Sequence, residues 1–174
     1  SYDVTDGTTS VSSLASLNVT PVNDVPVVSG TLTSSIVEDT ASVTGQLAIT
    51  DADGGESTFK VQTDDTAPTY GTFSITDTGA WTYKLDNTDT AVQALAKDAT
   101  LTDTVSVEAY DGTTQALTIT INGTNDVPTI AVKTDADDLT GSLTEDGGTL
   151  KATGSLTITD TDTGENQFDT TADY

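Results

Sequence analysis

Residues 73–85 read Phe-Ser-Ile-Thr-Asp-Thr-Gly-Ala-Trp-Thr-Tyr-Lys-Leu, and this stretch predicts a β-hairpin. Apolar residues alternate with polar ones on both sides of a short turn, as Phe73-x-Ile75 before it and Trp81-x-Tyr83-x-Leu85 after it. Successive side chains of a strand point to opposite faces. The hairpin therefore predicts a sheet with one buried face and one wet face.

The same alternation recurs on both sides of this hairpin. It appears in Val43-x-x-x-Leu47-x-Ile49, in Val105-x-Val107-x-Ala109 and in Leu117-x-Ile119-x-Ile121. Gly45 fills one alternate position, which indicates a bulge or close packing. Only residues 90–96 read as helix, over one or two turns. Short strands with turn signals between them predict an all-β fold, an antiparallel Greek-key β-sandwich of the cadherin or immunoglobulin type.

The chain also contains a near-repeat, which predicts tandem modules. Asn23-Asp24-Val25-Pro26 returns as Asn125-Asp126-Val127-Pro128, 102 residues later, and other motifs return at similar spacing. Each proline restricts the residue before it to extended geometry, as in a stiff linker. We therefore expect residues 1–24 to be the end of a preceding repeat and its linker, residues 25–124 a complete repeat, and residues 125–174 the first half of the following one.

The charge balance limits the functions that the chain can have. It carries 28 acidic and 5 basic residues, with a formal net charge of −23, and it has neither cysteine nor histidine. A basic surface for nucleic acid or an anionic membrane is therefore excluded. Hard cations bound by oxygen are the metals that fit such a composition. No nucleophile motif, phosphate loop or long apolar run appears, so we expect neither an enzyme nor a membrane-inserted segment.

The acids gather where the predicted modules join. In an antiparallel sandwich, the Asn23-Asp24 linker, the Asp51-x-Asp53 loop and the Asp111 turn share one end of the module, and Glu38 lies near the other. Acids from two adjacent modules then surround one linker. Calcium takes six to eight oxygen ligands in a tolerant geometry and removes the repulsion between such carboxylates. The alternative is that these acids are only solvated loop residues.

A resemblance to a known family supports the calcium interpretation. The motifs that carry it are the Asn-Asp-x-Pro junctions, Glu38-Asp39, the Thr50–Phe59 run, Tyr70–Phe73, Trp81–Asn87, Val92–Leu95, Leu101–Asp103 and Asp111–Thr114. In these motifs the sequence resembles the VCBS repeats of large bacterial surface adhesins and RTX-type proteins exported by type I secretion.

The same acids are similar to the cadherin calcium pattern. That resemblance implies that Asn125 and Asp126 are linker ligands, joined by Glu38 of the preceding module and by Asp160 and Asp162 of the following one. Asn23, Asp24, Asp51, Asp53 and Asp111 build the equivalent site at the other end, and Glu145 is the counterpart of Glu38 in the following repeat. The late acidic pair of cadherins has no clear counterpart, although Asp98 or Asp103 is a candidate. Glu56 has no firm role in that pattern, and either binds metal or caps its own loop.

These observations predict a calcium-rigidified spacer in a giant bacterial adhesin, secreted or at the cell surface, which supports adhesion or biofilm formation. Its partners are then the neighbouring repeats of the same chain. Two alternatives stay open: a filament or matrix subunit that self-associates by strand complementation, and a module that binds a glycan or a protein. An exposed aromatic cluster around Trp81 would favour the last, and a buried Trp81 would count against it.

Overall fold

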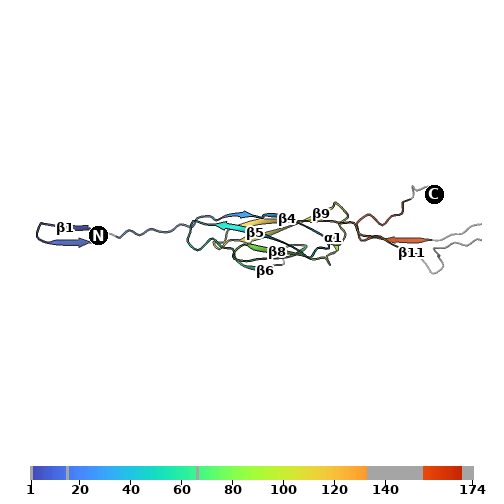
Figure 1. Ribbon diagram of the computed structural model, residues 1–174, viewed down its shortest axis with the longest axis horizontal. Helices are drawn as coiled ribbons and strands as arrows, with labels where there is room; N and C mark the ends of the chain where they lie inside the picture. Colours follow the sequence, from blue (N-terminus) through green and yellow to red (C-terminus); the bar gives the residue numbers. More distant parts are fainter. Residues whose placement is uncertain (1, 15, 66, 133–154, 170–174) are drawn as a thin grey trace, which may run out of the picture.

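The computed structural model describes residues 2–14, 16–65, 67–132 and 155–169. A β-sandwich forms its centre, and a two-stranded ladder lies on either side of it along the long axis (Figure 1). The first ladder pairs β1 (Tyr2–Thr5) with β2 (Ser10–Ser13), and the second pairs β11 (Thr129–Val132) with β12 (Leu156–Thr159).

The larger sheet of the sandwich has five antiparallel strands in the order β3-β5-β8-β7-β6. At its centre is the hairpin that residues 73–85 predict, with Phe73 opposite Tyr83 and Ile75 opposite Trp81. The strands are β3 (Val27–Gly30), β5 (Ser42–Thr50), β6 (Gln62–Asp65), β7 (Gly71–Ile75) and β8 (Ala80–Leu85).

The smaller sheet has the order β4-β10-β9, with β4 (Thr33–Val37), β9 (Thr100–Glu108) and β10 (Thr114–Asn122). Its two long strands form a second hairpin, whereas β4 pairs with β10 in parallel. This parallel pair arises because the chain leaves the larger sheet after β3 and joins the smaller one in the same direction. Gly30, at φ 104°, makes the crossing, and a Cβ there would lie 2.5 Å from the Gln46 carbonyl oxygen.

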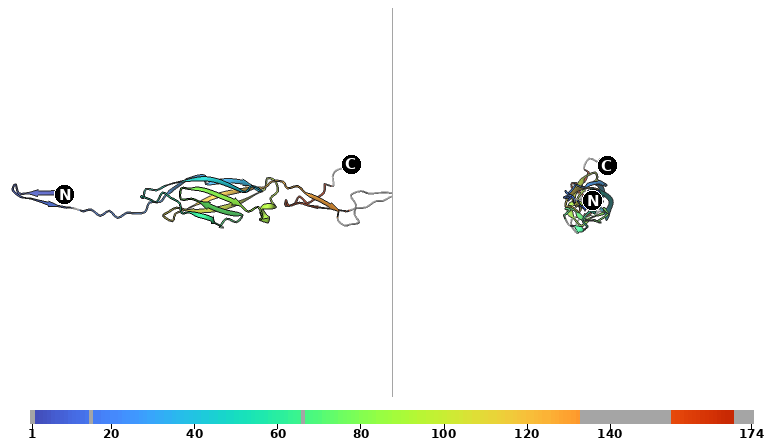
Figure 2. Two further views of the ribbon diagram at one scale, coloured as in Figure 1. Left: turned by 60° about the horizontal axis from the view of Figure 1, so that its bottom comes forward. Right: turned by 90° about the vertical axis from the view of Figure 1, so that its left-hand side faces the viewer.

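The chain passes between the two sheets a second time just before β6, beside the edge strand β9. The Lys60 amide donates to the Glu108 carbonyl at 2.8 Å, and the Tyr110 amide donates to the Thr58 carbonyl at 3.0 Å. The chain then turns to the other sheet, where β6 pairs with β7. The segment before β6 therefore lies beside the end of β9, which limits edge-to-edge pairing at that end. Figure 2 shows the two layers from a second direction.

The core lies between the inner faces of the two sheets. Trp81 is 2% exposed and packs against Phe73, with 6.0 Å between ring centroids. Gly45 is required by this packing, because a Cβ there would lie 2.3 Å from Cζ2 of Trp81. Of the two expectations for Gly45, a bulge or close packing, the structure shows close packing. The Trp81 ring occupies the volume that a side chain at this position would need.

The predicted helix is present as α1 (Thr90–Gln93). The Asp89 carboxylate caps it by accepting hydrogen bonds from the amides of Ala91 and Val92. Val92 and Leu95 point into the core and are both buried. In the described part of the chain, no helix has the length and apolar character that a membrane crossing requires.

Candidate metal centres at the junctions between repeats

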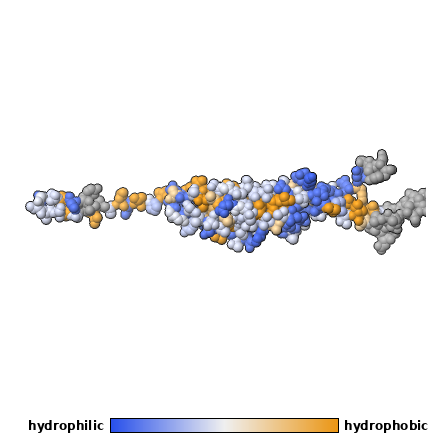
Figure 3. All heavy atoms as spheres, in the orientation of Figure 1, coloured by the Kyte–Doolittle hydropathy of each residue, from blue (hydrophilic) through white to orange (hydrophobic). Residues whose placement is uncertain are grey.

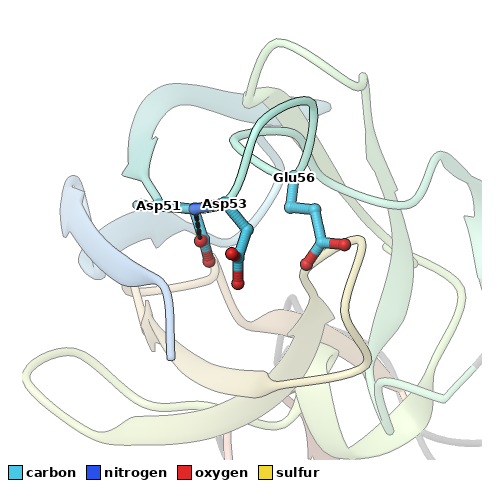
Figure 4. A group of neighbouring side chains, drawn as sticks. All are labelled: Asp51, Asp53 and Glu56. Carbon is cyan, nitrogen blue, oxygen red and sulfur yellow. Dashed lines mark hydrogen bonds between the residues drawn. The ribbon is translucent and has the colours of Figure 1, made fainter. Parts of the chain in front are cut away.

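Among the residues that the structure describes, three acids of one loop form the tightest acidic cluster. Asp51, Asp53 and Glu56 follow the end of β5, and each offers a carboxylate oxygen within 4.8 Å of the others. Figure 4 shows their carboxylates converging below the loop backbone. The Asp53 amide donates to Asp51 Oδ1 at 2.7 Å, and the Asp51 amide donates to Ser57 Oγ at 2.9 Å. These bonds fix the loop so that its acidic side chains face the same point.

The linker and the Asp111 turn meet this loop. The main-chain amide of Asp24 donates to Asp53 Oδ2 at 2.7 Å. Asn23 Nδ2 donates to Asp111 Oδ2 at 3.3 Å, across 88 residues of sequence. The structure therefore brings Asn23, Asp24, Asp51, Asp53 and Asp111 to one end of the sandwich.

The electrostatics of this end differ from one acid to the next. Burial, followed by repulsion from Asp53, Asp51 and Asp111, raises the pKa of Glu56 above its ordinary value. The pKa of Asp111 is lowered, mainly because the amide and hydroxyl of Thr113 donate to its carboxylate. A cation bound near Glu56 would relieve this repulsion.

The second junction repeats the same geometry. The Asp126 amide donates to Asp162 Oδ2 at 2.7 Å, and the Asp162 amide donates to Asp160 Oδ1 at 3.0 Å. In both linkers the asparagine side chain donates to the carbonyl of the next residue, at 3.0 Å from Asn23 and 2.5 Å from Asn125. Each Asp-x-Asp loop therefore holds the main chain of the linker that precedes it.

Glu38 reaches this second junction from the sandwich, where it directly follows β4. Its Oε1 accepts hydrogen bonds from the amide and the hydroxyl of Thr124, the latter at 3.2 Å. Glu38 is 3% exposed and Asp162 is 2% exposed, so both are buried acids. The contact with Thr124, two residues before Asp126, is one that sequence reasoning missed, because threonine at a linker carries no acidic signal.

Several buried carboxylate oxygens have no hydrogen-bond partner. They are Oδ2 of Asp51 and Oε2 of Glu56 at the first junction, and Oε2 of Glu38 and Oδ1 of Asp162 at the second. The ion pairs found among the described residues join other acids, Lys60 with Glu108 and Lys84 with Asp64. Unpaired buried carboxylates are costly, and a hard cation bound by oxygen ligands fits such a donor set.

Other predicted candidates lie elsewhere. Asp103 is buried between the sheets and accepts hydrogen bonds from the amides of Thr69 and Tyr70 and from the Tyr83 hydroxyl, at 2.8, 2.9 and 2.5 Å. It is a core residue with a full set of partners, so it does not supply the missing late acid. Asp98 sits in a turn at φ 69°. Glu145 lies outside the described residues. Trp81 is buried, which counts against glycan binding through an exposed aromatic cluster.

A two-sheet sandwich whose Asn-Asp linkers meet acidic loops is the architecture of a cadherin-like module. Residues 23–123 match the family model described as the bacterial cadherin-like domain, and the chain belongs to this family. Cadherin-like domains are typically non-enzymatic, extracellular modules of the adhesion type, and they generally bind calcium.

Solved structures similar to the chain include Protocadherin Gamma B2 extracellular cadherin domains 1-5, at 19% identity and a TM-score of 0.42, with 77% of this chain and 26% of that chain covered. Another is the Protocadherin GammaB4 extracellular domain, at 19% identity and a TM-score of 0.41, with 81% and 22% covered. The chain thus spans about a quarter of the length of these proteins. Likenesses of this size add nothing to the family assignment. The search of curated proteins returned no match.

Proposed function

We propose that both junctions bind calcium and that the chain is a spacer whose repeats are stiffened by the bound ions. Asp51, Asp53, Glu56 and Asp111 would hold an ion at the first junction, beside Asn23 and Asp24. Glu38, Asp160 and Asp162 would do so at the second, beside Asn125 and Asp126. Calcium supplies a divalent charge that compensates these carboxylates and links groups from adjacent repeats.

The observation that carries this proposal is the pair of buried, unpartnered carboxylate oxygens on Glu38 and Asp162. The two acids belong to different repeats and hold the same linker, through the amides of Thr124 and Asp126. Asp53, which occupies the place of Asp162 at the first junction, is only partly buried. The junction that Glu38 reaches thus encloses its aspartate more fully, which supports a site shared by two neighbours.

The parent protein is, in this proposal, a large extracellular bacterial adhesin of the VCBS and RTX type that passes through type I secretion and supports surface attachment or biofilm formation. The partners of the module are the neighbouring repeats. Extracellular calcium modules have dissociation constants of about 10⁻⁴ to 10⁻³ M. Export into a calcium-rich medium would then stiffen the array only after it leaves the cell.

A calcium titration of the full chain tests this function. With a dissociation constant near 1 mM, about 10 mM calcium adds roughly 1.4 kcal/mol of stability per site. A gain of that size raises the melting temperature by several degrees, of the order of 4–8 °C per kcal/mol for a module of this length. Small-angle scattering on the same samples should show a stiffer, more extended particle. Equal melting temperatures in chelator and in excess calcium would refute the proposal.

A further inference from the structure

The following repeat touches the complete one through a contact that involves no acid. The Thr163 amide, in the Asp-x-Asp loop of the following repeat, donates to the Ala94 carbonyl at 3.2 Å. Ala94 is the C-cap of α1. The last carbonyls of a helix have no partner within the helix, so they are ready acceptors for an outside donor. Thr163 satisfies one of them from the neighbouring repeat.

Gly123 brings the linker close enough for this contact. Its amide donates to the Ala99 carbonyl at 2.9 Å. A Cβ at Gly123 would lie 2.3 Å from the Ala96 oxygen and 2.4 Å from the Leu95 oxygen. Any other residue would therefore push the linker away from the chain that follows α1. The carbonyls of Ala94, Leu95 and Ala96 thus face the linker and the next repeat together.

The first linker cannot make the same contacts. In the register set by the two Asn-Asp-Val-Pro motifs, Pro21 stands where the second linker has Gly123, and Val22 stands where it has Thr124. Proline has no amide hydrogen to donate, and its ring needs the space that Gly123 leaves empty. Valine has no hydroxyl to donate to a carboxylate such as that of Glu38. The two junctions share their acids but differ in this contact.

From these contacts we propose that the surface formed by Ala94, Leu95, Ala96 and Gly123 is a docking surface for the Asp-x-Asp loop of the following repeat. It restrains the orientation of that repeat even before a metal ion binds. Linkers with glycine at this position form a docked joint, and linkers with proline form a joint that depends on the acids alone. An array of these repeats then contains two kinds of joint. The residue at the position of Gly123 and Pro21 tells which kind a given joint is.

Spin labels on the full chain test this inference. The sequence has no cysteine, so Thr44→Cys and Ala131→Cys, both at exposed positions, place one label on each side of the second junction. Pulsed electron–electron double resonance in chelator then measures the spread of distances between the two spin labels. We expect a single narrow distribution in the metal-free parent protein.

Thr163→Pro removes the donor and is compatible with the loop. The Glu165 amide donates to the Asp162 carbonyl, which makes Thr163 the second residue of a turn, and Gly164 follows at φ 89°. Proline followed by a residue of positive φ suits such a turn. We expect Thr163→Pro to lose the narrow distribution in chelator. Thr163→Gly, which copies Gly54 of the first loop and keeps the amide, should retain it.

Gly123→Ala provides a second variant on the other side of the contact, with Trp81 fluorescence to show that the sandwich remains folded. It should also lose the narrow distribution. A broad distribution in the metal-free parent, or a narrow one in Thr163→Pro, would overturn the proposal. Calcium is added last. A narrow distribution of the parent protein in chelator that calcium does not alter supports docking and counts against stiffening by calcium. The two proposals can therefore fail separately.

Discussion

The main-chain amide of Asp126 donates a 2.7 Å hydrogen bond to the carboxylate of Asp162, and these two residues hold the linker against the loop of the next repeat. Asp24 and Asp53 form the same bond at the same distance at the first junction. One carboxylate oxygen of Asp162 and one of Asp53 thus accept a hydrogen bond from the main chain of the linker. The remaining carboxylate oxygens are the ones available to a cation.

Replacement of Asp53 by asparagine should abolish most of the calcium response of the first junction. It removes a negative charge from the cluster of Asp51, Asp53 and Glu56 while keeping the size of the side chain. We expect a weaker calcium-dependent rise in melting temperature, measured by differential scanning calorimetry with and without chelator. Asp77→Asn removes the same charge from an exposed turn and should keep the full rise. A full rise in Asp53→Asn as well would contradict the assignment.

Glu56→Gln should stabilise the metal-free protein at neutral pH and weaken calcium binding. The pKa of Glu56 is raised in the folded state, so the folded protein holds this proton more tightly than the unfolded chain. Stability therefore falls as pH rises from the unfolded pKa through the folded one, and it is regained on acidification. Melting temperatures of the parent and Glu56→Gln in chelator, measured from pH 4 to pH 7, should diverge as pH rises. Parallel curves would argue against the raised pKa.

Gly45→Ala should destabilise the sandwich by about 1–3 kcal/mol, the usual cost of overpacking a dense core. The added Cβ would lie 2.3 Å from the Trp81 ring, which fills the space between the sheets. Urea unfolding followed by the fluorescence of Trp81, the single tryptophan, measures this loss. Gly54→Ala is the matched control, because a Cβ at Gly54 meets nothing within 4 Å. A parent-like midpoint for Gly45→Ala would show that Trp81 can move aside.

Asp103→Asn should cost about 1–3 kcal/mol of stability, equally in calcium and in chelator. The NH2 group of asparagine would face a hydrogen-bond donor where a carboxylate oxygen now accepts. That donor is either the Thr69 amide, or the Tyr70 amide and the Tyr83 hydroxyl. Tyr83→Phe removes only one of the three bonds and should cost less. Urea unfolding in both conditions checks the prediction. A loss of calcium affinity in Asp103→Asn, with stability unchanged, would instead make Asp103 a metal ligand.

Much of the fold could be predicted from local patterns. The hairpins around Thr76–Gly79 and Tyr110–Gly112 follow from strict alternation on both sides of a turn, because period two leaves one face to bury. The parallel pairing of β4 with β10 could not be predicted in this way. It depends on the crossing at Gly30, and a glycine in a strand pattern does not indicate which sheet the chain joins next.

The candidate site, too, could be predicted only in part from the sequence. The order and spacing of the acids in two copies indicated which residues gather at each junction. Three features were absent from that pattern: the role of Glu56 in the tightest cluster, the contact of Glu38 with Thr124, and the burial of Asp103. Each depends on which segments the sandwich brings side by side.

By itself, the sequence determined an all-β fold and predicted a repeated array with acids at its joints, because alternation and recurrence are properties of the chain read in order. Only the tertiary structure decided which carboxylate oxygens are left without partners and that Thr163 reaches Ala94 at the end of α1. The physical reason is that burial and hydrogen bonding depend on residues far apart in sequence. The distinction between Gly123 and Pro21 acquires its meaning from that packing alone.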